Sequence, residues 1–214
     1  MPVLKEIYRL LSRAFGRQHW WPGDTPFEIA VGAILTQNTN WSNVEKAIGN
    51  LKAARALSAR RLHEMPVRKI AELIRPAGYF NIKAKRLKSF IDFLSDCHGG
   101  SMERMRHAET ETLRRELLSV HGIGPETADS ILLYALGKPV FVIDAYTKRV
   151  LSRHGIMDHD EPYEDFQALF HSALKPDVRL FNEYHALFVR AGKIYCRPKP
   201  LCESCPLNAL DGAV

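Results

Sequence analysis

The segment LRRELLSVHGIGPETADSILLYALG, residues 113–137, holds the pattern that decides the fold. Its leucine spacing predicts a helix that ends just before the glycines, and Pro125 is placed to open a second helix. Gly122 and Gly124 allow a tight turn, and Ile123 between them can fill the gap between the helices. Such a turn leaves backbone N–H groups free at a helix N-terminus, where an anion is favoured. The segment therefore predicts a helical hairpin that holds a phosphate group, with an ordinary corner between two helices as the alternative.

Helical periodicity continues on both sides of this segment. Thr25–Glu28 predicts a capping box with proline at the first helical position. The helix that follows is apolar on nearly every side, so we expect it to be central and buried. Only Val140–Ile143 is predicted to be extended, and it is too short for a sheet. The sequence therefore predicts an all-α protein of about ten helices, the others covering residues 3–15, 41–54, 66–75, 81–96, 109–119, 125–136, 144–154, 162–174 and 179–194.

The composition limits the class of protein. With 46% hydrophobic and 25% charged residues it is that of a globular protein, which excludes disorder as a description of the whole. No apolar run approaches the roughly 18 residues that span a bilayer, and the N-terminus carries no secretory signal. We therefore expect a cytoplasmic protein with no membrane association. The net charge of +6, from 30 Lys and Arg against 24 Asp and Glu, favours a polyanionic partner to a modest degree.

An acid follows the predicted extended segment. Asp144 lies at a predicted helix start, 20 residues after Gly124. Taken by itself it is a helix N-cap, since aspartate is favoured there.

Five ordered segments together resemble the helix-hairpin-helix (HhH-GPD) DNA glycosylases, the endonuclease III superfamily. They are Ile34–Thr39, Gly78–Ala84, the hairpin at 113–137, Asp144 with Arg149 and Val150, and the cysteines near the C-terminus. The resemblance covers nearly the whole chain. It implies a two-lobed all-α fold with double-stranded DNA in the cleft between the lobes. We expect a central lobe over residues 25–144, a second lobe formed by 1–24 and 145–194, and a cysteine loop over 195–214.

The resemblance implies that Asp144 acts on the N-glycosidic bond of a flipped nucleotide. Its carboxylate would stabilise positive charge on the sugar and orient or deprotonate a water. Bifunctional members carry a lysine two residues after the second hairpin glycine, and here that position is Glu126. A carboxylate cannot form a Schiff base, so we expect a monofunctional glycosylase without AP-lyase activity. Glu126 is otherwise explained as an acid in the first turn of a helix.

The aromatic residues bear on the damaged base. The pattern around Trp20, Trp21, Pro22 and Trp41 is most similar to the 3-methyladenine DNA glycosylase III branch, in which aromatic side chains sandwich an alkylated purine. N3-methyladenine in DNA is cationic, so a tryptophan face attracts it by cation–π interaction as well as by stacking. The alternative is that these tryptophans fill a core. Mismatched thymine or uracil and oxidised pyrimidines are the competing substrates.

Further residues are placed against DNA by the same resemblance. Gln37 and Asn38 match the loop that fills the gap left by the flipped base, although they could instead cap the preceding helix. Tyr79 matches the wedge that enters the opposite strand. The remaining predicted DNA contacts are His121, Gly122, Ile123, Gly124, Glu126 and Thr127 in the hairpin, with Lys83 and Arg149 outside it. A monovalent cation at the hairpin is also expected.

The cysteines predict a metal site. In a cytoplasmic chain, four cysteines argue against disulfides, and Cys196, Cys202 and Cys205 fall within ten residues of one another. Family members with a [4Fe–4S] cluster carry a fourth thiolate about six residues beyond the third, where this chain has Asp211. Three thiolates with Asp211 could hold such a cluster or a zinc ion, or the loop could bind nothing.

The leading hypothesis is a monomeric DNA-repair enzyme, a monofunctional N-glycosylase. A non-catalytic DNA-binding protein that keeps the hairpin is the second hypothesis, and the presence of Asp144 in its motif favours the enzyme. A metal-structured interaction domain unrelated to DNA is the third, and the hairpin argues against it.

Overall fold

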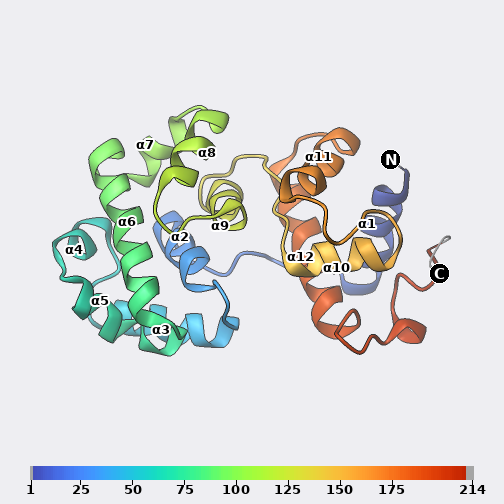
Figure 1. Ribbon diagram of the computed structural model, residues 1–214, viewed down its shortest axis with the longest axis horizontal. Coiled ribbons are helices and arrows are strands. Elements are labelled where there is room, and N and C mark those ends of the chain that lie inside the picture. Colours follow the sequence, from blue (N-terminus) through green and yellow to red (C-terminus); the bar gives the residue numbers. More distant parts are fainter. Residues whose placement is uncertain (1, 211–214) are drawn as a thin grey trace. The chain divides into compact units, whose positions relative to one another are not determined.

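A computed structural model describes residues 2–210 and divides the chain into two compact units. Unit 1 comprises residues 1–21 and 139–214, and unit 2 comprises residues 22–138. Within the described residues all regular structure is helical and no strand forms (Figure 1). The predicted all-α class is therefore confirmed. No helix among residues 2–210 has both the length and the hydrophobicity that crossing a bilayer requires.

Unit 2 is built around α2 (Pro26–Leu35), which packs against α3, α6 and the π-helical turn η2. Most of α2 is buried, as its uniform hydrophobicity predicted. Thr25 caps the helix by accepting a hydrogen bond from the Glu28 amide at 3.1 Å, which forms one half of the predicted capping box. The Glu28 carboxylate instead pairs with Lys52 at 2.7 Å. The other elements of unit 2 are α3 (Trp41–Ala53), α4 (Ala59–Glu64), α5 (Val67–Leu73), η1 (Arg75–Ala77), α6 (Phe80–His98), α7 (Met102–His107), α8 (Thr110–Ser119), α9 (Pro125–Ser130) and η2 (Ile131–Ala135).

Two of these helices, α4 and α7, were not predicted. Each has six residues and begins at a serine cap, Ser58 or Ser101. Helices of fewer than two turns show too few repeats for an apolar period to be recognised. The predicted helix over 125–136 is also divided, because it continues from α9 into the π-helical turn.

Unit 1 joins the two ends of the chain. It contains α1 (Pro2–Phe15), α10 (Ala145–Arg153), α11 (Tyr163–Ala173), α12 (Val178–Ile194) and the short η3 (Cys202–Ser204). The Tyr184 hydroxyl donates a hydrogen bond to the Leu4 carbonyl at 2.6 Å, which ties α12 to α1. Phe141 stacks on Phe170 with ring centroids 3.7 Å apart. In Figure 1 the blue helix α1 lies beside the red helix α12, so segments far apart in sequence share this core.

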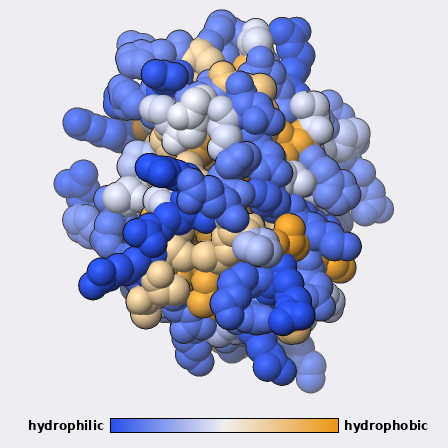
Figure 2. All heavy atoms as spheres, turned by 90° about the vertical axis from the view of Figure 1, so that its left-hand side faces the viewer, coloured by the Kyte–Doolittle hydropathy of each residue, from blue (hydrophilic) through white to orange (hydrophobic). Residues whose placement is uncertain are grey.

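The unit boundaries fall at residues 21/22 and 138/139, a few residues from the predicted divisions at 24/25 and 144/145. The face of unit 2 seen from the left of Figure 1 is mainly hydrophilic, with small separate hydrophobic patches (Figure 2). The largest exposed apolar side chains of unit 2 are Tyr79 and Ile82, 70% and 51% exposed, which lie three residues apart at the start of α6.

Candidate active site

Asp144 is the N-cap of α10, and its side chain is only 11% exposed. One carboxylate oxygen, Oδ1, accepts a hydrogen bond from the Thr147 amide at 2.7 Å. The other, Oδ2, lies 3.5 Å from Nε2 of His185, which is buried in α12. The carboxylate is thus held at a helix N-terminus, where negative charge is favoured.

The charge of Asp144 is set by opposing effects. Burial alone would raise the pKa of the carboxyl group, but the neighbouring His185 and the hydrogen bond from Thr147 hold that pKa below its usual value. The group is therefore ionised at neutral pH while it is largely shielded from solvent. Such a carboxylate can stabilise positive charge on a bound molecule.

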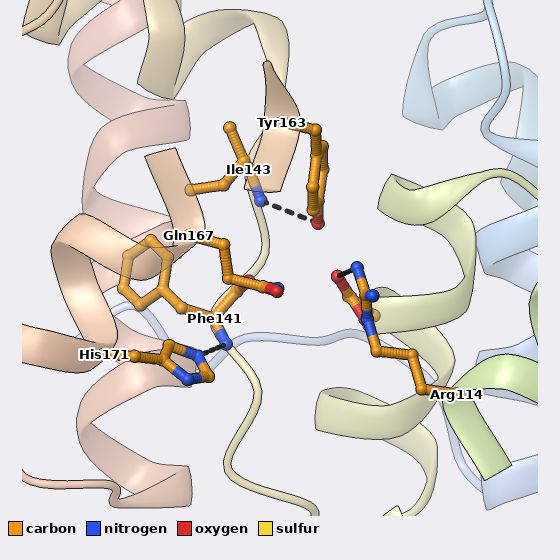
Figure 3. Close-up of polar contacts among 7 residues, drawn as sticks. Arg114, Phe141, Ile143, Tyr163, Gln167 and His171 are labelled. Carbon is orange, nitrogen blue, oxygen red and sulfur yellow. Dashed lines mark hydrogen bonds and ion pairs between the residues drawn. The ribbon is translucent and has the colours of Figure 1, made fainter. Parts of the chain in front are cut away.

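Side chains of α11 fix the segment that leads to Asp144. The Phe141 amide donates to Nε2 of His171 at 3.0 Å, and the Ile143 amide donates to the Tyr163 hydroxyl at 3.2 Å (Figure 3). Gln167 donates to the Phe141 carbonyl at 2.7 Å. Residues 140–143 belong to no helix or strand, and helix side chains satisfy several of their backbone groups where a sheet would otherwise do so.

The predicted hairpin is present in unit 2. It consists of α8, a turn over residues 120–124 and α9. Gly122 has a φ of +83°, and a Cβ there would lie 2.1 Å from Cγ of Arg86, so both the backbone and the space demand glycine. Ile123 is buried, as expected for a side chain that fills the gap between the helices. His121, Gly124 and Glu126 are exposed.

A buried ion pair supports the hairpin from inside. Arg114 on α8 donates two hydrogen bonds to Asp129 on α9, at 2.7 and 3.0 Å. Asp129 is fully buried, so the pair fixes the two helices in one register.

The side chain of Gln37 is hydrogen-bonded to the hairpin. Its amide nitrogen donates to the Gly122 carbonyl and to the Thr127 hydroxyl, each at 3.0 Å, and its oxygen accepts from Arg86 at 2.5 Å. Gln37 therefore braces the hairpin in this structure, and its gap-filling role stays a prediction. The Thr127 hydroxyl is buried in the same network, and its contact with DNA stays a prediction. Asn38 is exposed, with a φ of +53°, and keeps its gap-filling role as a prediction.

Two cations predicted to contact DNA have partners inside the protein. Lys83 is 1% exposed, and its ammonium donates to the carbonyls of Leu35 and Ala77. Arg149 donates to the Cys196 carbonyl at 2.6 Å and to the Gly192 carbonyl at 3.3 Å. Both cations serve internal carbonyls, so neither is presented to a ligand.

The predicted base-pocket residues are divided between the units. Trp20 and Trp21, in unit 1, pack edge to face with centroids 5.4 Å apart. Trp41 begins α3 in unit 2, and Pro22 is exposed at the start of that unit. All three tryptophans are half-buried. Their role against a base stays a prediction, as does the role of Tyr79 as a wedge.

The cysteine loop is held by α10. Arg153 donates to the Arg197 carbonyl at 2.6 Å and lies 3.4 Å from Sγ of Cys196. Burial raises the pKa of the Cys205 thiol, and the nearby Cys196 and Cys202 add to that rise. No three His, Cys, Asp or Glu side chains of residues 2–210 are grouped closely enough to hold a single metal ion. Asp211, the predicted fourth ligand, lies outside the described residues.

The sequence does not predict the contact of His185 with Asp144. His185 lies among apolar neighbours in α12, where a histidine has no distinctive spacing relative to Asp144, 41 positions earlier in the chain. Only the packing of α10 against α12 brings the two side chains together.

Comparison with known proteins identifies the class. Residues 31–176 match the profile of the HhH-GPD superfamily of base excision DNA repair proteins. A protein of Methanocaldococcus jannaschii named as a candidate DNA repair glycosylase is 47% identical over 207 residues, which cover 96% of this chain and 94% of that protein. Endonuclease III of Thermotoga maritima is 28% identical over 96% of this chain and 91% of its own length. The chain therefore belongs to the HhH-GPD superfamily of base excision DNA repair proteins.

Solved structures agree with that assignment. The 3-methyladenine DNA glycosylase of H. pylori, solved with 1,N6-ethenoadenine, superposes with a TM-score of 0.74 at 30% identity, over 90% of this chain and 96% of that one. An endonuclease III–DNA complex superposes with a TM-score of 0.81 at 20% identity, over 96% and 92%, and shows the shared fold. The predicted family, endonuclease III-like and similar to the 3-methyladenine branch, is confirmed.

Proposed function

We propose that this protein is a monofunctional DNA N-glycosylase that removes an alkylated purine from double-stranded DNA. The observation that carries the proposal is the Asp144 carboxylate, buried, ionised and in contact with His185 at the family's motif position. A helix cap can be formed by an exposed aspartate such as Asp177, so burial of the Asp144 charge supports a role beyond capping. The chain would act as a monomer.

The chemistry follows from the charge of this group. As the C1′–N bond of a flipped nucleotide breaks, the base leaves with the bonding electrons and the sugar becomes positive. The Asp144 carboxylate would stabilise that positive charge. A water then adds to C1′ and loses a proton, which leaves an abasic site and an intact strand.

The substrate class rests on leaving-group chemistry and on the relatives. A cationic alkylated purine departs without a strong general acid, and tryptophan faces attract it. A structural relative at 30% identity is a 3-methyladenine glycosylase with an ethenoadenine bound. The decisive experiment incubates the protein with DNA containing N3-methyladenine, ethenoadenine, G·T and G·U mismatches or thymine glycol, and measures released base. Release of the pyrimidines but not of the purines would replace this substrate class by that of endonuclease III.

The proposal includes the absence of AP-lyase chemistry. Glu126 occupies the position at which bifunctional relatives have a lysine, and the Lys138 amine is bound to the Ala108 carbonyl at 2.7 Å. We expect base release to leave the strand intact until heat or alkali cleaves it, as seen on a denaturing gel. Trapping of a covalent adduct by borohydride, with a yield like that of endonuclease III, would refute this part of the proposal.

The hairpin would bind a DNA phosphate through its exposed turn, together with a monovalent cation. The +6 net charge supports binding to a polyanion. Titration of K⁺ and Na⁺ at constant ionic strength during duplex binding tests the cation separately from general salt effects. Equal affinity in K⁺, Na⁺ and a bulky organic cation would exclude it.

The cysteine loop fits an iron–sulfur cluster by the chemistry of its donors, Cys196, Cys202 and Cys205. When bound, the cluster would supply a structural cross-link for a segment that has few buried side chains apart from Leu207 and Leu210. We expect about four irons per chain in anaerobically purified protein. Folded, active protein without iron or zinc would show that packing alone holds the loop.

A further inference from the structure

Lys83 is the only lysine among residues 2–210 that is fully buried. It lies on α6, and its ammonium donates hydrogen bonds to the Leu35 carbonyl at 2.7 Å and to the Ala77 carbonyl at 2.8 Å. Burial, together with the positive charge of Arg86, lowers the pKa of Lys83 to about 8. An apolar side chain would occupy this space at a lower desolvation cost, so the amine has a task beyond filling volume.

The two carbonyls bound by Lys83 end two different helices. Leu35 is the last residue of α2, and Ala77 is the last residue of η1. Carbonyls at helix C-termini lack partners within the helix and carry partial negative charge. One ammonium therefore connects the C-terminal ends of two helices that are 42 residues apart in sequence.

Each of these helix ends is followed within three residues by an exposed residue with a left-handed backbone, and these two residues, Asn38 and Tyr79, form the tips of their loops. Asn38, three residues after Leu35, has a φ of +53°. Tyr79, two residues after Ala77, has a φ of +45° and is 70% exposed. Residues other than glycine persist in this left-handed region only when the surrounding structure fixes them. Lys83 binds the carbonyl that lies three residues before Asn38 and the carbonyl that lies two residues before Tyr79.

A second side chain of α6 also holds the loop that contains Asn38. Arg86, one turn after Lys83 on α6, donates to Oε1 of Gln37, the residue before Asn38. Helix α6 also begins at Phe80, directly after Tyr79. The loop with Asn38 and the turn with Tyr79 are thus both attached to helix α6.

We infer that Lys83 is a positioning residue that sets the separation of Asn38 and Tyr79, so that the two tips enter a DNA duplex together. The inference rests on the proposed function, since it assumes that a nucleotide is displaced from the duplex. Lys83 itself touches no DNA. Its loss should impair insertion of the tips much more than binding of the phosphate backbone.

The test uses a duplex that needs no catalysis. It carries a tetrahydrofuran abasic analogue with 2-aminopurine opposite, whose fluorescence rises when that base loses its stacking partners. Affinity is measured separately by anisotropy on a fluorescein-labelled copy of the duplex. The full-length wild-type protein is compared with Lys83→Met and with Lys85→Met, an exposed lysine two residues away that loses the same charge.

We expect the fluorescence gain per bound complex to fall about threefold or more in Lys83→Met, while Kd changes by less than about threefold. Lys85→Met should leave the gain per complex at the wild-type value, whatever it does to Kd. If Lys83→Met does not fold by circular dichroism, Lys83→Gln decides, because its amide is too short to reach both carbonyls.

Three outcomes separate the two proposals. A wild-type gain in the folded Lys83 variant would overturn the role of Lys83. Wild-type protein that binds the duplex without any fluorescence gain would also overturn it, since no tips would then enter. Wild-type protein that does not bind the abasic duplex at all would instead overturn the proposed function.

Discussion

The carboxylate of Asp144 in unit 1 is 11% exposed and both of its oxygens have contacts, whereas the side chain of Tyr79 in unit 2 is 70% exposed on a left-handed backbone. The first arrangement suits a charge that acts in the absence of water, because electrostatic stabilisation grows as water is excluded. The second suits a side chain that must enter another molecule, with rigidity supplied through the backbone. Burial in one unit and tethering in the other are two ways to hold a side chain in place.

The largest effect should come from Asp144→Asn. Shape and N-capping are kept while the negative charge is lost, so base release should fall by about 10²-fold or more, with DNA affinity nearly unchanged. Single-turnover release and duplex binding measure the two quantities. Asp177→Asn is the matched control, since Asp177 caps α12 through a hydrogen bond from the Leu180 amide at 2.7 Å and is exposed. Retention of more than about a tenth of the rate would remove Asp144 from the chemistry.

A smaller loss is expected from His185→Leu. Removal of a hydrogen-bonding partner from a buried charge is comparable to about 1.5–3 kcal/mol, which corresponds to a decrease in kcat of about 10- to 100-fold with KM little changed. His185→Gln keeps an N–H donor and should recover part of that loss. Equal losses in both variants would mean that His185 serves only packing.

The same variant should shift a pH profile. In the wild-type protein the pKa of Asp144 is lowered, so its contribution to stability is complete above the unfolded pKa of about 4 and is lost as the pH falls through the lower folded value. In His185→Leu, burial acts with less opposition and the pKa of Asp144 rises. The acid limb of kcat/KM should therefore move to higher pH. An unchanged acid limb would show that His185 does not influence the carboxylate.

The smallest effect is expected in the free energy of unfolding when the hairpin glycines are replaced by alanine. Of the two substitutions, only the one at Gly122 should destabilise the protein. Gly122→Ala requires both a positive φ and a displaced Arg86, and we expect about 1–3 kcal/mol of destabilisation in urea unfolding. Gly124→Ala has open space and a φ of −92°, so its effect should stay within about 0.5 kcal/mol. Similar losses at both positions would show that flexibility, and not the close approach of Arg86, governs the turn.

Sequence patterns predicted the features that depend on neighbouring residues. The sequence predicted the hairpin, the buried helix α2 and the cap at Thr25, because the residues that specify each of them lie within one or two helical turns of one another. His185 was not predicted, since its partner is supplied by another helix. Lys83 was misassigned because a lysine in a basic run is ordinarily exposed, and only the carbonyls of two distant helix ends make its burial tolerable. The sequence placed Gln37 in a loop after α2, but the direction of its side chain depends on hydrogen bonds with Arg86 and with the hairpin.

The route of the chain through unit 1 has a consequence for biosynthesis. Unit 2 is one continuous stretch, so its core can be completed once residue 138 has left the ribosome. Helix α1 is made first, yet it has to wait for α12, whose Tyr184 binds the Leu4 carbonyl. Nascent chains should therefore acquire the folded hairpin before the aspartate is enclosed. A translation product that ends shortly after residue 138 would contain the folded hairpin but would lack Asp144.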